Sequence, residues 1–457
     1  MANAEVQVCD LLIDNAHVLT MDAARTVHEN GAVAVTGNRI AAVGPAAEIG
    51  RSYRASRVID AGGSLVHPGM IDLHYHATVH MVGKMIAEVA LDADAGPWVA
   101  QQYTGLINAL DDEAEHANAL LCGLDMLKAG ITAFMDPGTA FAPDAVAEAA
   151  TALGMRASLG EPWLWDVRGV QLADIKGMEA DFERCMEQLG GQLWRNRDED
   201  GLVRGHVALY GMGAESVELA LAAKAAAEEE GAVWTMHQSQ SADDAEDDDR
   251  RFGRHPLVYL RDKGVLGPNG VFVHMNVLRD DEIVPVVESG LTVVWSPSNT
   301  WYYGTRTSHR SRMPELFAKG VNVGIGTDVS KASGFGDQLY TAYVLARDQG
   351  DYVSPEDLLQ MVTANGARGL GMADRLGSLE PGKLADIVIR TDDLPEAWPR
   401  YNPVRQHLLL ARSKSVDTVI VGGETVLRGG RLVRMDEAVV YAKAQAAAEA
   451  MRERAGL

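Results

Sequence analysis

The chain has 457 residues, of which 47% are hydrophobic and 23% charged, and its formal net charge is -23. This balance is typical of a globular enzyme, and the length allows one large barrel or two to three smaller domains. Acidic residues outnumber basic ones by 64 to 41 and no basic stripe reverses this locally, so we expect neither nucleic acid nor a membrane surface as partner.

The cysteines and the start of the chain predict a cytoplasmic protein. Cys9, Cys122 and Cys185 lie far apart without a CxxC pair, which argues against a disulfide framework and fits a reducing compartment. The first residues lack the basic start and long apolar run of a secretory signal. No stretch of about 18 apolar residues occurs, so no membrane span is expected.

The predicted elements fall into three regions, the first of which is residues 1–67. Short β-rich runs lie at residues 11–19, 31–35, 40–43 and 56–60, with turn residues between them. This pattern predicts a small sheet of antiparallel hairpins.

Residues 68–374 alternate short apolar runs with helical stretches. The expected strands lie at residues 132–136, 157–160, 206–210, 233–237, 271–274, 291–295 and 321–327, and residues 216–230 are typical of the helices. Such alternation, repeated about eight times, predicts parallel strands closed into a (β/α)8 barrel. The acidic run at residues 243–249 is interpreted as a solvated loop.

Residues 375–435 return to short strands, at residues 385–389, 416–421, 424–427 and 431–433, and residues 436–457 predict a closing helix. The simplest account is that the two β-rich ends pair with each other. The expected fold class is therefore α/β, with a TIM-like (β/α)8 barrel inserted in a small β-sandwich formed by the N- and C-terminal segments.

The strongest chemical signal is HPGMIDLHYH at residues 67–76. A Pro-Gly turn and a short apolar strand precede His74 and His76, and residues two apart on a strand point to the same face. Both imidazoles can then bind one metal ion. A bare His-x-His pair is weak evidence, but its place at the end of a strand strengthens it.

Three more predicted barrel strands end in a candidate ligand: His237, His274 and Asp328. Each alone is readily explained as an ordinary polar residue at a strand end. Together with the histidine pair they predict a metal site, because catalytic groups of this barrel gather at the C-terminal ends of the strands.

On these motifs, with GVNVGIGTDVS at residues 320–330 and LGSLEPGKLADIV at residues 376–388, the chain is identified as a member of the amidohydrolase superfamily. It resembles the branch of cytosine and guanine deaminases and chlorotriazine hydrolases over nearly its whole length. The resemblance implies that His74, His76, His237 and Asp328 bind the metal, and that His274 contacts the activated water or the substrate oxygen. It also implies a homo-oligomer.

The resemblance further implies one divalent ion, because no lysine follows the predicted fourth strand as in binuclear relatives. Zinc is the first choice, and iron, cobalt and manganese remain alternatives. A divalent ion lowers the pKa of a bound water from about 15.7 to about 7 in favourable sites. Asp328 would accept the proton, and His274 would steer the attack on the substrate carbon.

One departure from the deaminase pattern concerns the substrate. Deaminase relatives have glutamate three residues after the strand-five histidine, where this chain has Gln240, and a histidine in the strand-four loop, where it has Gly211-Met212-Gly213. We take Gln240 as a candidate catalytic residue, although an amide carries no proton.

Both changes favour cleavage of a neutral, aryl or apolar small molecule that is an amide, urea, carbamate or thiocarbamate, in the style of phenylurea hydrolases. The alternative is an aminohydrolase or dechlorinase acting on an N-heterocycle, and a metal-free scaffold protein is a third possibility.

Loop residues around the predicted site give weaker hints about the pocket. The aromatic candidates for its wall are Trp163, Trp165, Trp301, Tyr302 and Tyr303. The polar candidates are His80, Arg306, His309 and Arg310. Ordinary packing and solvation explain either set equally well.

Overall fold

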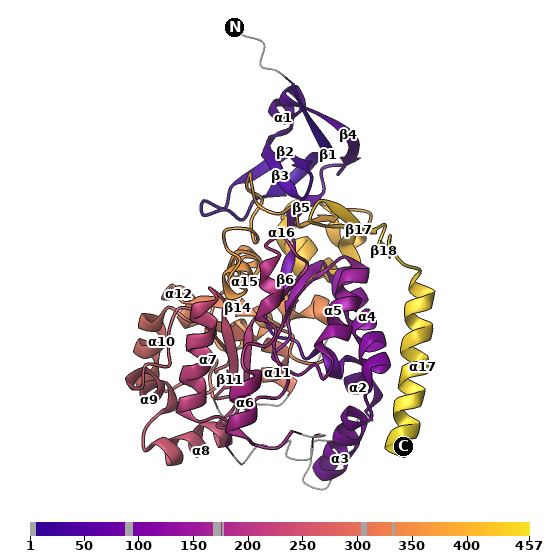
Figure 1. Ribbon diagram of the computed structural model, residues 1–457. Helices are drawn as coiled ribbons and strands as arrows, with labels where there is room; N and C mark the ends of the chain where they lie inside the picture. Colours follow the sequence, from indigo (N-terminus) through magenta and orange to yellow (C-terminus); the bar gives the residue numbers. More distant parts are fainter. Residues whose placement is uncertain (1–5, 87–94, 168–174, 176–177, 303–308, 331–333) are drawn as a thin grey trace.

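The computed structural model describes residues 6–86, 95–167, 175, 178–302, 309–330 and 334–457. Two parts are visible in Figure 1: a sheet built from both ends of the chain, and a barrel below it. The expected fold class, a TIM-like barrel joined to a sheet of terminal strands, is confirmed. The boundaries at residues 67, 374 and 435 remain a prediction.

The terminal sheet has nine strands. They are β1 (Gln7–Leu19), β2 (Val27–Thr36), β3 (Arg39–Pro45), β4 (Tyr53–Asp60), β5 (Leu65–Pro68), β15 (Ile387–Arg390), β16 (Val416–Val421), β17 (Glu424–Arg428) and β18 (Arg431–Leu432). Their order is β18-β17-β16-β15-β5-β1-β2-β3, with β4 also on β1. The antiparallel pair β5–β15 joins the two ends of the chain, as the sequence predicts.

The prediction of purely antiparallel hairpins is wrong for β4 and β5, which both run parallel to β1. The reason is α1 (Ala46–Ser52), which lies between β3 and β4. A crossover of this kind returns the chain to the same end of the sheet, whereas a tight turn allows only an antiparallel neighbour.

The barrel strands form two parallel ladders. They are β6 (Met70–Asp72), β7 (Ile131–Met135), β8 (Arg156–Leu159) and β9 (Val203–Gly205), followed by β10 (Val207–Gly211), β11 (Trp234–Gln238), β12 (Gly270–His274), β13 (Thr292–Trp295) and β14 (Asn322–Ile325). The backbone N–H of Leu73 donates to Ile325 at 3.0 Å, and that of His206 to Leu159 at 3.0 Å. These two bonds close the ladders into one barrel.

Helices surround the barrel and follow its strands (Figure 1). The longer ones are α3 (Ala95–Asn108), α4 (Asp112–Ala129), α5 (Pro143–Leu153), α7 (Val217–Glu229), α8 (Ala242–Phe252), α13 (Gln338–Asp348) and α17 (Glu437–Ala455). The shorter ones are α2 (His80–Met85), α6 (Phe182–Gln188), α9 (Pro256–Asp262), α10 (Ile283–Ser289), α11 (Pro297–Tyr302), α12 (Met313–Ala318), α14 (Pro355–Met361), α15 (Ala364–Gly369) and α16 (Pro403–Arg405). The closing helix α17 packs along α4, as expected of a C-terminal helix.

The interpretation of residues 243–249 as a loop is wrong, because they lie in α8. Ser241 caps this helix, and Asp244 completes a capping box with it. Acidic side chains in the first turn and basic ones in the last both suit the helix dipole. These local bonds outweigh the mutual repulsion of the carboxylates.

A buried ion pair fastens the barrel to the terminal sheet. Arg156 donates from Nε and Nη2 to Asp386 at 2.9 and 3.0 Å, and each side chain is only 4% exposed. We expect Asp386→Ala to lower the free energy of unfolding by about 3–5 kcal/mol, because it leaves a buried charge uncompensated. Chemical denaturation measures this change.

The matched control is Asp200→Ala, which removes the exposed partner of Arg39 and is expected to cost less than about 1 kcal/mol. Equal effects of the two variants would contradict the role given to Asp386.

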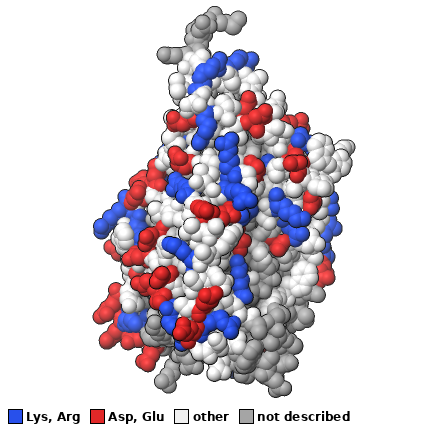
Figure 2. Space-filling view, turned by 90° about the vertical axis from the view of Figure 1, so that its right-hand side faces the viewer, with Lys and Arg blue, Asp and Glu red and all other residues white. Residues whose placement is uncertain are grey.

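Charged side chains of both signs are mixed over the face in Figure 2. None of the helices in the described part of the chain combines the length and apolar character needed to cross a bilayer.

Candidate metal centre and active site

Two histidines leave the end of β6 next to the end of β14. The carboxylate of Asp72 accepts bonds from the backbone of His74 at 3.1 Å and from Thr327, so it fixes both strand ends. Burial raises the pKa of Asp72 to about 7. A Cβ at Gly326 would lie 2.6 Å from the Cβ of His74, so only glycine allows β14 to approach this closely.

The structure brings the predicted ligands together. Asp328 Oδ1 lies 3.3 Å from His74 Nε2 and 3.1 Å from His76 Nε2. His237 Nε2 lies 3.2 Å from His76 Nε2. Four ligands about 2.0–2.1 Å from one ion in a tetrahedral arrangement are about 3.3 Å apart. The donor atoms therefore have the spacing that a single divalent ion requires.

His274 joins the same group from β12. Phe272, two residues earlier in β12, faces the surrounding helices. Because residues two apart on a strand point to the same face, regular alternation would turn His274 toward the helices as well. The left-handed conformation of His274, with φ 74°, breaks the alternation. Its ring centroid lies 5.4 Å from that of His74 and 5.3 Å from that of His237, so the imidazole faces the ligands.

Contacts behind the ligands fix their ring orientations. The Nδ1 atom of His237 bonds to the backbone oxygen of Tyr210, and that of His76 lies 3.2 Å from Thr139 Oγ1. Both Nε2 atoms are thereby turned to the centre, as in known metal sites. Neither ring nitrogen of the buried His74 has a hydrogen-bond partner among the described residues, and a metal would satisfy Nε2.

The electrostatics favour the metal-binding protonation states. Burial lowers the pKa of His74, His237 and His274 to about 3, so these imidazoles stay neutral. Burial opposes ionisation of Asp328, but contacts with His74 and His76 outweigh it and hold the pKa of the carboxyl well below its usual range. Neutral imidazoles and a carboxylate are the forms that bind metal.

Gln240 reaches this group through Asn299, which sequence reasoning missed. The side-chain amide of Gln240 donates to Asn299 Oδ1 at 3.5 Å, and Asn299 Nδ2 donates to Asp328 Oδ2. The sequence contains only weak evidence for Asn299. It lies shortly after the predicted strand 291–295, as the other site residues lie at or after the ends of their predicted strands.

Tyr210 is a second residue that sequence reasoning missed. It is the last residue but one of β10, and its ring centroid lies 5.2 Å from that of His237. The rings of Trp163 and Trp165 lie 5.8 and 5.3 Å from it. Burial raises the pKa of Tyr210, and the charge of Asp328 adds to this, so its hydroxyl stays protonated. No lysine follows β10 at this place.

The remaining candidates from the sequence are dispersed. Trp163 and Trp165 are buried beside Tyr210, whereas Trp301 is 44% exposed. His80 is buried between the Tyr75 hydroxyl and Lys84 Nζ. Arg310 pairs with Asp351. His309 and Tyr302 are half-buried, and Tyr303 and Arg306 lie outside the described residues.

A (β/α)8 barrel with histidines and a carboxylate converging at its strand ends defines a metal-dependent hydrolase. The amidohydrolase family model matches residues 65–426, so the chain belongs to that family of hydrolases. A model of a bacterial imidazolonepropionase-like composite domain matches residues 31–55.

Two curated relatives are nucleoside-type deaminases. A 5-methylthioadenosine/S-adenosylhomocysteine deaminase of Syntrophobacter fumaroxidans is 31% identical, over 93% of this chain and 95% of its own. A 5'-deoxyadenosine deaminase of Methanothermobacter thermautotrophicus is 30% identical, over 92% of this chain and 94% of its own.

Two solved structures share the fold. An adenosine deaminase from Xanthomonas campestris with bound zinc is 25% identical, covers 98% of this chain and 100% of its own, and has a TM-score of 0.85. Atrazine chlorohydrolase TrzN from Arthrobacter aurescens TC1, complexed with zinc, is 24% identical. It covers 96% of this chain and 100% of its own, and has a TM-score of 0.81.

The resemblance to the amidohydrolase superfamily and its deaminases is confirmed by the family model and the curated relatives, and the chlorotriazine hydrolase shares the fold. The finer expectation of a phenylurea or thiocarbamate hydrolase is not supported, because the similar proteins are deaminases and a chlorohydrolase.

Proposed function

We propose that the chain is a zinc-dependent aminohydrolase that replaces the amino group of an N-heterocycle, such as an adenine base, with oxygen from water. The observation that carries this is the convergence of His74, His76, His237 and Asp328 at ligand spacing. Similarity to deaminases over more than nine-tenths of the chain supports the substrate class.

The metal ion and several side chains would each have a separate role in the reaction. A bound divalent ion supplies Lewis acidity and a water of lowered pKa. The carboxylate of Asp328 is ionised and can accept a proton, while Asn299 donates a hydrogen bond to its Oδ2. The imidazole of His274 lies beside the rings of His74 and His237 and can bond to the substrate. Tyr210 offers an aromatic face and a hydroxyl donor.

A second candidate function is hydrolytic dechlorination of an N-heterocycle. Gln240 favours it, because an amide cannot pass a proton to a ring nitrogen or to a departing amine. A chloride leaves as a stable anion and needs no such proton. In the deamination reaction Asp328 would have to return the proton it has accepted.

Product release separates these two functions. We expect the zinc-loaded protein to release ammonia from at least one of 5'-methylthioadenosine, S-adenosylhomocysteine, 5'-deoxyadenosine and adenosine. Chloride release from atrazine without ammonia from any nucleoside would favour the second function. Failure to release either product from protein with a full complement of zinc would contradict both.

Introducing a proton carrier should increase the rate of deamination. We expect Gln240→Glu to raise the kcat of ammonia release by about 10²-fold, a typical effect of a general acid. The new carboxyl would face Asn299 Oδ1, and a protonated carboxyl can donate a bond to that oxygen. Steady-state ammonia release over pH 5–9 measures the gain.

Gln240→Met is the control, because it keeps the size of the side chain but carries no proton. An unchanged kcat in the Gln240→Glu variant with full zinc content would contradict the expectation.

A further inference from the structure

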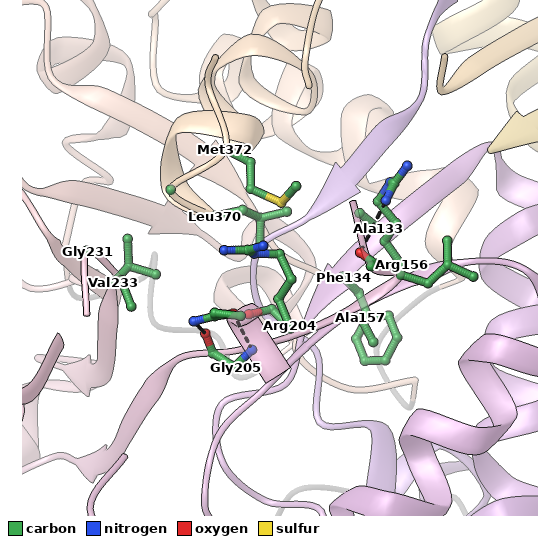
Figure 3. A pocket seen from close by; sticks show the side chains of 16 residues that line it. Ala133, Phe134, Arg156, Ala157, Arg204, Gly205, Gly231, Val233, Leu370 and Met372 are labelled. Atoms are coloured by element: carbon green, nitrogen blue, oxygen red, sulfur yellow. Dashed lines mark hydrogen bonds between the residues drawn. The ribbon is translucent and has the colours of Figure 1, made fainter. Parts of the chain in front are cut away.

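A small hollow of about 20 Å³ opens at the N-terminal ends of the barrel strands (Figure 3). Val233 lines it at the start of β11, whereas His237 lies at the other end of the same strand. Four residues of strand span about 13 Å. Side chains that include Val271 and Val273 fill the barrel interior between the two places. A molecule in this hollow would therefore not touch the metal centre.

Two arginines line the hollow, and only one has its charge neutralised. Arg156 is paired with Asp386. Arg204, in β9, has a single hydrogen bond, from Nη1 to the backbone oxygen of Glu199 at 3.3 Å. No carboxylate in the described part of the chain pairs with it. Figure 3 shows its side chain pointing toward Leu370 and Met372.

The surroundings make this unpaired guanidinium unusual. All the residues that line the hollow are described, and none of them is acidic. Half-burial lowers the pKa of Arg204 and the nearby charge of Arg375 adds to this, while the charges of Glu199 and Asp374 oppose it. A cation with a purely structural role would be expected to use more of its five N–H donors.

A larger groove of about 550 Å³ adjoins the hollow and shares Arg204 and Asn196 with it. Leu189, Leu193 and Trp194 give it apolar surface, and Trp194 is 53% exposed. The other central cation, Arg375, is neutralised by Glu199 at 2.9 Å. The exposed Arg197 also lines the groove, so Arg204 is the half-buried cation that remains available to a ligand there.

We propose that this end of the barrel binds a small organic monocarboxylate, with its carboxylate on the Arg204 guanidinium and its apolar body along Leu193 and Trp194. The planar fork of an arginine matches the two oxygens of a carboxylate. Glu229 and Glu230 at the groove, together with the formal net charge of -23, disfavour polyanions such as nucleotides.

Titration of the zinc-loaded protein with 4-fluorobenzoate, followed by ¹⁹F NMR at constant ionic strength, tests this site. We expect saturable binding that Arg204→Gln weakens about tenfold or more, since a charged bond is lost. Arg204→Lys keeps the positive charge but lacks the planar guanidinium, so its affinity should lie between those of the wild type and Arg204→Gln. The matched control is Arg54→Gln, which removes an exposed arginine of β4 in the terminal sheet and should leave binding unchanged.

Zinc content and melting temperature establish that each variant is folded, and the uncharged probe 4-fluorobenzamide tests the need for the carboxylate. Three results would overturn the proposal: equal affinity of wild type and Arg204→Gln, equal affinity for the amide, or displacement of the probe by equimolar inorganic phosphate.

Discussion

Replacing Asp328 by asparagine is expected to lower kcat/KM by about 10³-fold or more. Asparagine is neutral, so it neither accepts the proton of an attacking water nor offers a charged ligand. The effect should be large because one carboxylate would serve both as metal ligand, with Oδ1 within 3.3 Å of two of the imidazoles, and as proton acceptor. Initial rates with the best substrate of the product screen measure this.

Asp280→Asn is the matched control, because that carboxylate is 97% exposed and pairs with Arg312. Its kcat/KM should equal that of the wild type. If Asp328→Asn retains more than a tenth of the wild-type kcat/KM, the proposed role of Asp328 as proton acceptor and metal ligand is contradicted.

Exhaustive chelation is expected to lower activity to below about 1% and to lower the melting temperature. An ion that binds only the folded chain stabilises it by about 2.7 kcal/mol at a free concentration of 100 times its Kd. The buried His74, whose ring nitrogens lack hydrogen bonds among the described residues, would lose its partner. Differential scanning calorimetry and rate measurements before and after chelation measure both effects.

One equivalent of zinc should restore both properties. The variant His76→Ala, already depleted of metal, should show no further loss on chelation. Full activity at less than about 0.1 zinc per chain would contradict a catalytic ion.

Most of the barrel could be predicted because its strands are short apolar runs with polar residues at their ends. His74 and His76 stand two apart after β6, and the bridge between Tyr75 and Asp328 continues the strand pairing there, so both imidazoles point to the same side. The helix α8 could not be predicted from its acidic composition, because the bonds of its Ser241–Asp244 capping box decide the outcome. The parallel partners of β1 likewise depend on a crossover that composition does not specify.

The rest of the candidate site depends on pairing between distant segments. The position of Tyr210 beside His237 follows from the register of β10 on β11, in which Gly211 lies opposite His237. The link from Gln240 through Asn299 to Asp328 joins three strand ends and has no local signal. The direction of His274 depends on a left-handed backbone that strand periodicity does not predict.

The most direct test of the shared ion is zinc K-edge X-ray absorption of the purified protein, combined with metal analysis. We predict one zinc per chain, with three imidazole nitrogens and a carboxylate oxygen at about 2.0–2.2 Å. Loss of this signal in His74→Ala and Asp328→Ala should accompany loss of the metal. Zinc that stays bound in both variants with an unchanged coordination shell would contradict a centre formed by these strand ends.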